Sequence, residues 1–418
     1  MSNEICKLTF RDKLWLLVFV PVFFTTSGIY RGQRTNIGDI YSLQQGGLVL
    51  PLTFFIGVLI ALFIILNFLR NGKAYVPAIV RPVLILFLVS TAMGLIGWII
   101  SGTPVPFILS AQFSSGYLGI VLALWFFKYR QMDFITACGF ISKIYIVNML
   151  LHMAYSYYMV GLVSTVRGMV PETPLWGINQ IFVYYPLIIS AVFMFALPYW
   201  LKYGKKVFVP VYLFVFSYVY LCEVKAATIS FVSAMVFYFA VVNKDKRVIK
   251  AASVLIISLL MWFFSGHGRI SSHMFSDATR WAHYAAVSEN IVKEPAHFIY
   301  GNLFGGTEIT DSGRSILGPI GGSVHNQYVD YFQYGGIILL SAYALFFIAY
   351  YKYMMRGIDD VNKNPEQRFI IWWLGIVSIQ AIVDFNVDTP LRSVNPAIIY
   401  WFYWFGALLT ARSYGKQA

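Results

Sequence analysis

The residues best suited to chemistry gather in one stretch, between positions 266 and 334. It holds five of the six histidines, which are His267, His273, His283, His297 and His325. The same stretch carries four cations, Arg269, Arg280, Lys293 and Arg314. Imidazole can move a proton near neutral pH, and guanidinium and ammonium groups bind anions. These residue types together point to proton transfer beside a bound anion such as a phosphate.

The first part of this stretch is predicted to be a helix. Ser276 or Asp277 would cap its start, and Pro295 would stop it. Its apolar residues fall within about a third of the circumference, with Ser288 interrupting that face and Val287 outside it; they are Trp281, Tyr284, Ala285, Ile291 and Val292. We expect this side to lie against the membrane surface or the outer ends of membrane helices. Arg280 falls in the first turn.

A second helix is predicted after the glycine-rich run 318–322, with Ser323 as its cap. It would continue past Phe332 and Gly336 into a membrane span. His325 would then lie in the first turn, where free backbone N–H groups attract anions and lower the pKa of an imidazole. A neutral His325 could act as a base.

Each candidate also has an ordinary structural interpretation. His325 could be a hydrogen-bonded surface residue, and the apolar helix face could be plain packing. Arg280 and Arg314 could pair with nearby carboxylates. Lys225, at the outer end of a predicted helix, could be an anchor whose ammonium reaches the membrane interface.

The elements that would position these residues are membrane helices. Of the 418 residues 59% are hydrophobic and 12% charged, against roughly 25% charged in a typical soluble domain. Many apolar runs approach the ~20 residues that a helix needs to cross the hydrocarbon layer. We predict an all-α polytopic membrane protein, one domain over 1–418, with a large helical loop at 266–334 between the ninth and tenth of twelve spans. The spans are expected at 14–30, 48–69, 82–101, 105–127, 134–160, 178–201, 207–222, 226–242, 249–266, 334–350, 369–385 and 395–411.

The distribution of positive charge predicts the orientation. With a cytoplasmic N-terminus, about 21 of the 31 Lys and Arg residues lie in cytoplasmic segments, about 9 lie outside, and Lys143 lies within a span. Both termini are therefore expected in the cytoplasm, and the 266–334 loop on the opposite side. The net charge of +13 reports topology rather than nucleic-acid binding, because it is spread over separate loops and the two tails.

Several motifs resemble one family. The pattern His325-Asn326-x-Tyr328-Val329-x-x-Phe332, ending in Gly336, is similar to the HNxYLxxL…G signature of the O-antigen polymerase and ligase superfamily. The R…W…P…GxG stretch of that family resembles Arg280-Trp281 followed by Pro295, Gly301 and Gly305-Gly306. Its outside segment before a span resembles Arg167-Gly168 and Gly177-Ile178-Asn179. The sequence departs from the pattern at Lys225, where many members carry arginine, and at Leu339, which replaces a glycine.

The resemblance implies a GT-C-like glycosyltransferase in the bacterial inner membrane, acting on undecaprenyl-pyrophosphate-linked oligosaccharide at the periplasmic face. An acceptor hydroxyl would attack the anomeric carbon as the lipid pyrophosphate leaves, which needs a base and cations. The residues implied are His325 as base and Arg280 in catalysis, and, for pyrophosphate or glycan binding, Lys225, Arg314, Arg167, Asn326 and Tyr328. Pyrophosphate is a good leaving group, so neither metal nor cofactor is expected. Flippase and chain-length-regulator proteins are implied partners, and nucleic acid is not.

Three functions stay open at this point. A polymerase would transfer the glycan to the non-reducing end of another lipid-linked repeat, and the departures from the ligase-like pattern favour this interpretation. A ligase would transfer the polymer to the lipid A core. A lipid-linked oligosaccharide flippase or transporter belongs to a different class, whose polar residues cluster near the bilayer midplane; here Lys143 is almost the only charge deep in a span.

Overall fold

The computed structural model describes residues 8–25, 80–114, 116–160, 181–221, 225–238, 278–304, 326–360, 365–384 and 394–417. All regular elements in these ranges are helical, which confirms the predicted all-α class. The elements are α1 (Phe10–Thr25), α4 (Val80–Ser101), α5 (Val105–Ser114), α6 (Tyr117–Ala123), the π-helix η1 (Leu124–Tyr129), α7 (Phe134–Val160), α8 (Ile181–Tyr203), α9 (Phe208–Leu221), α10 (Lys225–Phe237), α13 (Ala278–Lys293), α14 (His297–Tyr300), α16 (Gln327–Asp360), α17 (Pro365–Asp384) and α18 (Val394–Gln417).

Most predicted spans that can be compared coincide with a helix. The ends of α4, α7 and α9 lie within two residues of the predicted ones. The predicted span 105–127 is not one continuous helix, because it divides into α5, α6 and η1. The helix α5 ends at Ser114 and α6 begins at Tyr117, directly after the weak helix former Gly116. The predicted spans 48–69 and 249–266 lie outside the described residues.

The outer helices carry a strongly apolar surface. Among the described residues, two segments are long and apolar enough to cross a membrane, Arg81–Ser101 in α4 and Gln327–Arg356 in α16. Large side chains are exposed on the outside of the bundle, including Leu88 at 68% and Ile99 at 80% on α4. Leu345 on α16 is 61% exposed. Apolar patches of this kind mark a membrane or partner surface rather than one that faces water.

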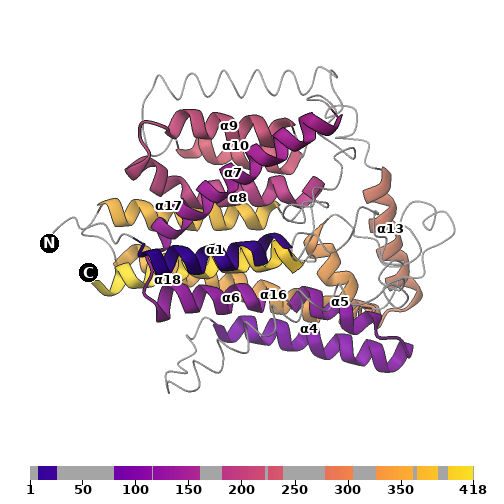
Figure 1. The fold of residues 1–418 in the computed structure, drawn as a ribbon. Coiled ribbons are helices and arrows are strands. Elements are labelled where there is room, and N and C mark those ends of the chain that lie inside the picture. Colours follow the sequence, from indigo (N-terminus) through magenta and orange to yellow (C-terminus); the bar gives the residue numbers. More distant parts are fainter. Residues whose placement is uncertain are drawn as a thin grey trace.

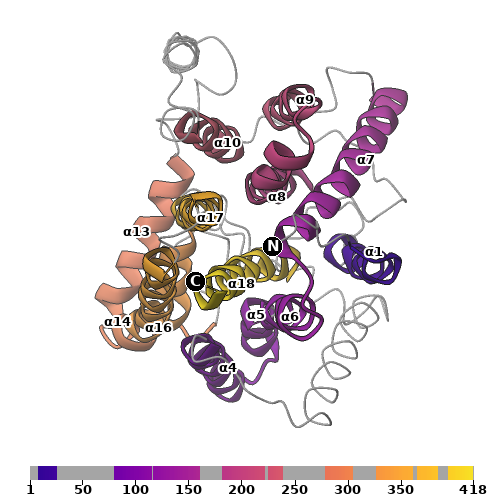
Figure 2. The same cartoon turned by 90° about the vertical axis from the view of Figure 1, so that its left-hand side faces the viewer.

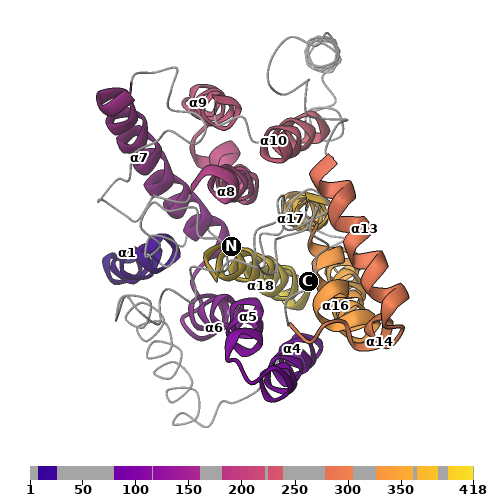
Figure 3. The same cartoon turned by 90° about the vertical axis from the view of Figure 1, so that its right-hand side faces the viewer.

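The core is built around α18. Figures 2 and 3 show this helix in the middle of the bundle, with α6, α8, α16 and α17 around it. It is apolar on nearly every side, and such a helix must be buried all round; Trp401 and Trp404 are each 1% exposed. Buried polar groups bond between helices. Trp373 of α17 donates its indole N–H to the carbonyl oxygen of Met194 in α8, at 2.7 Å.

Ion pairs join helices at their ends. Arg130, just after η1, donates to Oδ1 of Asp12 in α1 at 2.9 Å. Lys202 of α8 lies 2.5 Å from Oε1 of Glu366 in α17. Figure 1 shows the C-terminal end of α18 at the left of the bundle and α13 at the right, running crosswise to the long helices. The helix α13 therefore covers one end of the bundle.

Candidate functional site

The crosswise helix α13 lies where the sequence predicts a helix. It spans Ala278–Lys293, and Pro295 follows its end; the predicted caps at 276 and 277 lie outside the described residues. The predicted apolar face is only partly correct, because Tyr284 and Ile291 are half-buried but Ala285 and Val292 are exposed. Val287 is the buried residue, at 9% exposure, whereas Val292 is 80% exposed. The helix rests on the edges of α14 and α16, so it buries a narrow row at spacings of three and four residues rather than a third of its circumference.

Asparagine 326 caps α16 and joins it to α13. Its Oδ1 accepts hydrogen bonds from the backbone N–H groups of Tyr328 at 3.0 Å and Val329 at 3.2 Å. Its Nδ2 donates to the hydroxyl of Tyr284 in α13 at 3.4 Å. The predicted start at Ser323 is therefore wrong: α16 begins at Gln327, because Asn326 supplies both the cap and a donor to the neighbouring helix. His325, which was expected inside the first turn, lies outside the described residues.

A kink in α16 binds the loop that follows α14. Gly336 has φ 57° and ψ −155° inside the helix, so the carbonyls just before it cannot reach their usual donors four residues on. Two of these carbonyls accept from the loop instead. The N–H of Asn302 donates to Gln333 at 2.9 Å, and that of Phe304 donates to Tyr334 at 3.2 Å.

Two glycines allow the backbones to meet at this kink. Gly301 has φ 63°, and a Cβ atom there would lie 2.6 Å from the carbonyl oxygen of Gln333. A Cβ atom on Gly336 would lie 2.3 Å from the carbonyl oxygen of Ile299. Both positions need a positive φ and lack room for a side chain, so only glycine fits. Both belong to the family-like motifs of the sequence, and this geometry gives a physical reason for them.

An aromatic anchor fixes the other end of the loop. Phe304 is fully buried, and its ring stacks on that of Tyr334 with centroids 5.2 Å apart and an interplanar angle of 2°. Phe113 of α5 meets the same Phe304 ring edge-on at 5.4 Å. The loop is thus held between α5 and α16.

The structure brings together some of the predicted site residues. Arg280 lies in the first turn of α13, four residues before Tyr284, so its helix contacts the start of α16 through Asn326. Tyr328 is half-buried in the first turn of α16, and its ring lies 5.9 Å from that of Tyr343. Lys225 is the first residue of α10. His325, Arg314 and Arg167 lie outside the described residues.

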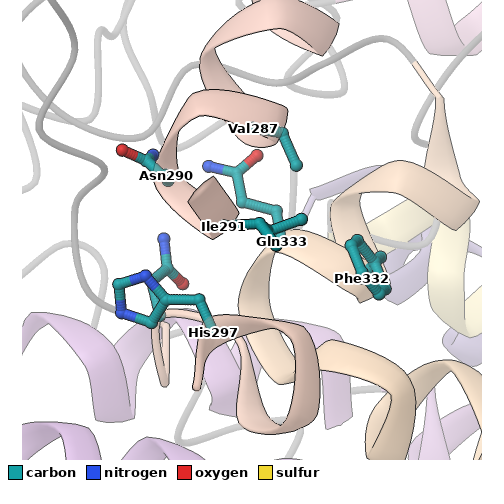
Figure 4. A pocket seen from close by; sticks show the side chains of 7 residues that line it. Val287, Asn290, Ile291, His297, Phe332 and Gln333 are labelled. Atoms are coloured by element: carbon teal, nitrogen blue, oxygen red, sulfur yellow. The ribbon is translucent and has the colours of Figure 1, made fainter. Parts of the chain in front are cut away.

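A pocket opens between α13, α14 and α16 (Figure 4). Its empty space is about 250 Å³, including the part that is open to solvent, and it is lined by Val287, Asn290, Ile291, His297, Asn302, Phe332 and Gln333. Figure 4 shows Asn290 and Ile291 from α13, His297 beside α14, and Gln333 from α16 around one opening. Four of the lining side chains are polar and none carries a fixed charge.

A carboxylate at the rim orients the groups of α14. Oε2 of Glu294 lies 3.3 Å from Nε2 of His297. Its other oxygen, Oε1, accepts the hydroxyl of Tyr300 at 3.3 Å. Partial desolvation, the charge of Glu294 and this hydrogen bond together raise the pKa of Tyr300, which keeps its hydroxyl protonated as a donor. A proton on Nε2 that faces the carboxylate leaves Nδ1 of His297 as an acceptor.

Sequence reasoning missed most of the pocket residues. His297 was one of five histidines in the stretch, with nothing to single it out except Glu294 three residues earlier. Asn290, Asn302 and Gln333 give no signal, because an amide in a loop or helix is ordinary. Their convergence depends on the kink at Gly336, which periodicity cannot reveal.

Comparisons with known proteins do not identify a related family or protein. No family model matches the chain, and a search among curated proteins finds no match. Function is therefore inferred from the motifs and from the contact between the helix that carries Arg280 and the start of the helix that follows His325 in the sequence.

Proposed function

We propose that this chain is a membrane-embedded glycosyltransferase that lengthens a surface glycan, using a donor linked to a lipid pyrophosphate. The observation that carries the proposal is the contact between Tyr284 and Asn326. It joins the helix of Arg280 to the helix start that directly follows His325. The helix that carries Arg280 and the helix start that follows His325 in the sequence therefore lie at one end of one bundle.

Contacts between helix ends support the proposed topology. Asp12 pairs with Arg130 and Lys202 with Glu366, and all four are expected in the cytoplasm. The helix α13 lies at the opposite end from the C-terminal end of α18 (Figure 1), and α14 contacts α13. With apolar helices between the two ends, the proposal is that the chain crosses the inner membrane about twelve times and presents α13, α14 and the start of α16 to the periplasm.

The reaction needs two functions from the protein. His325 takes the proton from the acceptor hydroxyl as its oxygen forms a bond with the anomeric carbon of the donor glycan. The bond from that carbon to the pyrophosphate oxygen breaks, and undecaprenyl pyrophosphate leaves with both electrons. Arg280 stabilises the negative charge that develops on this oxygen, aided by Lys225, Arg314 and Arg167.

We assign the acceptor as another lipid-linked repeat, which makes the protein a polymerase. The alternative is the ligase reaction, in which the acceptor is the lipid A core. A transporter would use polar groups near the middle of its spans. The one such cation, Lys143, donates to the hydroxyl of Tyr199 at 2.7 Å, and this tyrosine lies four residues from the end of α8. Lys143 is therefore explained as an anchor directed toward the helix end.

The test is a reconstituted transfer assay. The purified protein in lipid vesicles receives lipid-pyrophosphate-linked repeats extracted from cells that encode it, with chelator and no added metal. We expect longer glycans and release of lipid pyrophosphate. Arg280→Ala and His325→Ala should slow transfer by about 10²-fold or more, while Lys293→Ala, which removes an exposed cation of the same helix, should change it less than about twofold. Undiminished transfer by the first two variants would refute the proposal.

A further inference from the structure

The pocket between α13, α14 and α16 holds buried polar atoms without partners. Both polar atoms of the Asn302 side chain, Oδ1 and Nδ2, are buried and make no hydrogen bond within the described part of the chain. Nδ1 of His297 is in the same situation. A buried polar atom destabilises the fold if nothing satisfies it. A carboxamide and an imidazole that both face one cavity are the features expected of a binding site.

The pattern of donors and acceptors fits hydroxyl groups. Asn302 offers a donor and an acceptor side by side, and His297 offers Nδ1 as an acceptor when its ring proton is on Nε2, which faces Glu294. A hydroxyl is the group that both donates and accepts. Phe332 and Ile291 supply apolar surface in the same pocket. A ring with hydroxyls at its edge and C–H bonds on its faces matches this lining.

Charge excludes other ligands. The lining contains no Lys or Arg, and the carboxylate of Glu294 at the rim would repel an anion. Arg280 lies ten residues before Asn290, about 15 Å away along α13. The pocket is therefore separate from the cation assigned to the pyrophosphate. Its empty space of about 250 Å³ includes the part that is open to solvent, so the pocket admits no ligand larger than a single ring.

We infer that this pocket is a subsite for one uncharged sugar unit, held by Asn302 and His297 against Phe332. The inference rests on the proposed function for the identity of that unit as part of the glycan substrate. Binding itself needs no donor lipid and no transfer. The two ideas can therefore fail separately.

The experiment uses saturation-transfer NMR on the full-length protein in detergent. The probes are the methyl glycosides of glucose, galactose, mannose and N-acetylglucosamine, with inorganic phosphate as the anionic competitor. We expect saturation transfer to at least one glycoside, no competition by phosphate, and at least tenfold weaker binding by Asn302→Ala. The same variant should unfold at an unchanged or higher temperature, because it removes a buried polar group that has no partner.

The matched control is Ser190→Ala on α8. The hydroxyl of Ser190 is also buried without a partner in the described structure, but it does not line the pocket. This variant should likewise keep its stability and should bind the glycosides as the wild type does. No binding of any glycoside by the wild type, which would mean that ordered water alone fills the pocket, would overturn the inference. Binding that survives Asn302→Ala would do the same.

Transfer kinetics separate the two proposals. If transfer proceeds while Asn302→Ala leaves the KM for the lipid-linked repeat unchanged, the subsite is wrong and the glycosyltransferase stands. If the glycosides bind but no transfer occurs, the subsite stands and the proposed function is wrong.

Discussion

Replacing Gly336 by alanine tests how the kink of α16 holds the candidate site. Its φ of 57° and ψ of −155° lie in a region that costs an L-residue about 1–3 kcal/mol. The added Cβ would also stand 2.3 Å from the carbonyl oxygen of Ile299, which forces α14 away from α16. The two hydrogen bonds from Asn302 and Phe304 into the kink would be lost, at about 1 kcal/mol each.

The expected sum is about 3–5 kcal/mol. At roughly 2 °C per kcal/mol for a large chain, Gly336→Ala should lower the apparent unfolding temperature by roughly 6–10 °C. The assay follows a thiol-reactive dye on heating in detergent. Cys138 is fully buried and makes no disulfide, so in a Cys6→Ser, Cys222→Ser background it reports unfolding as the single thiol.

Two other glycines separate strain from crowding. Gly102 has φ 67°, and a Cβ there would have no atom within 4 Å, so alanine at this position adds strain alone. Gly375 has ordinary helical backbone, and a Cβ would come no closer than 3.8 Å to Met354 Cε, so alanine there should cost nothing or stabilise by up to ~1 kcal/mol. The expected order of unfolding temperature is Gly375→Ala at or above wild type, then Gly102→Ala, then Gly336→Ala. Equal temperatures for the last two variants would refute the tight contact between α14 and α16.

Two further predictions concern helix ends. Burial acts to raise the pKa of Asp12, but hydrogen bonds from Thr9 and Arg130 outweigh it and lower the pKa below its ordinary value. Asp12→Asn should therefore cost up to about 1 kcal/mol at neutral pH. The difference from wild type should begin to shrink as pH falls below about 4, the ordinary pKa of an aspartate, and should vanish only below the lowered pKa of the folded state. A pH-independent difference in unfolding temperature would contradict this. Asn326→Ala should lower the free energy of unfolding by about 1 kcal/mol, because it removes the cap of α16. Asn326→Asp keeps the acceptor oxygen and should lower it less. Equal losses of stability in the dye assay would show that the cap does not stabilise the helix.

The sequence predicts well those helices whose ends carry local signals. The helix α7 starts at Phe134, directly after Asp133. The carboxylate of Asp133 caps the helix, because its Oδ2 accepts the backbone N–H of Thr136 at 2.8 Å. The end of α13 is set by Pro295. These signals act within a few residues of each other, so they can be read without knowledge of the fold.

The sequence does not predict features that depend on a partner. Periodicity identified the apolar residues of α13 but could not tell that Val287 would be buried and Val292 exposed, because α14 and α16 decide which row is covered. The pocket around Asn302 depends on a kink 34 residues later in the chain. Its glycine was recognised only as part of a motif, with no structural role assigned.

The central claim is that α13, α14 and the start of α16 work on the outer side of the membrane, and cysteine labelling tests it most directly. Ser288 is exposed on α13 and Lys206 is exposed between α8 and α9, at opposite predicted sides. In a background free of other cysteines, a membrane-impermeant maleimide should label Ser288→Cys in intact cells and Lys206→Cys only after permeabilisation. Labelling of Lys206→Cys in intact cells, with Ser288→Cys protected, would contradict the account.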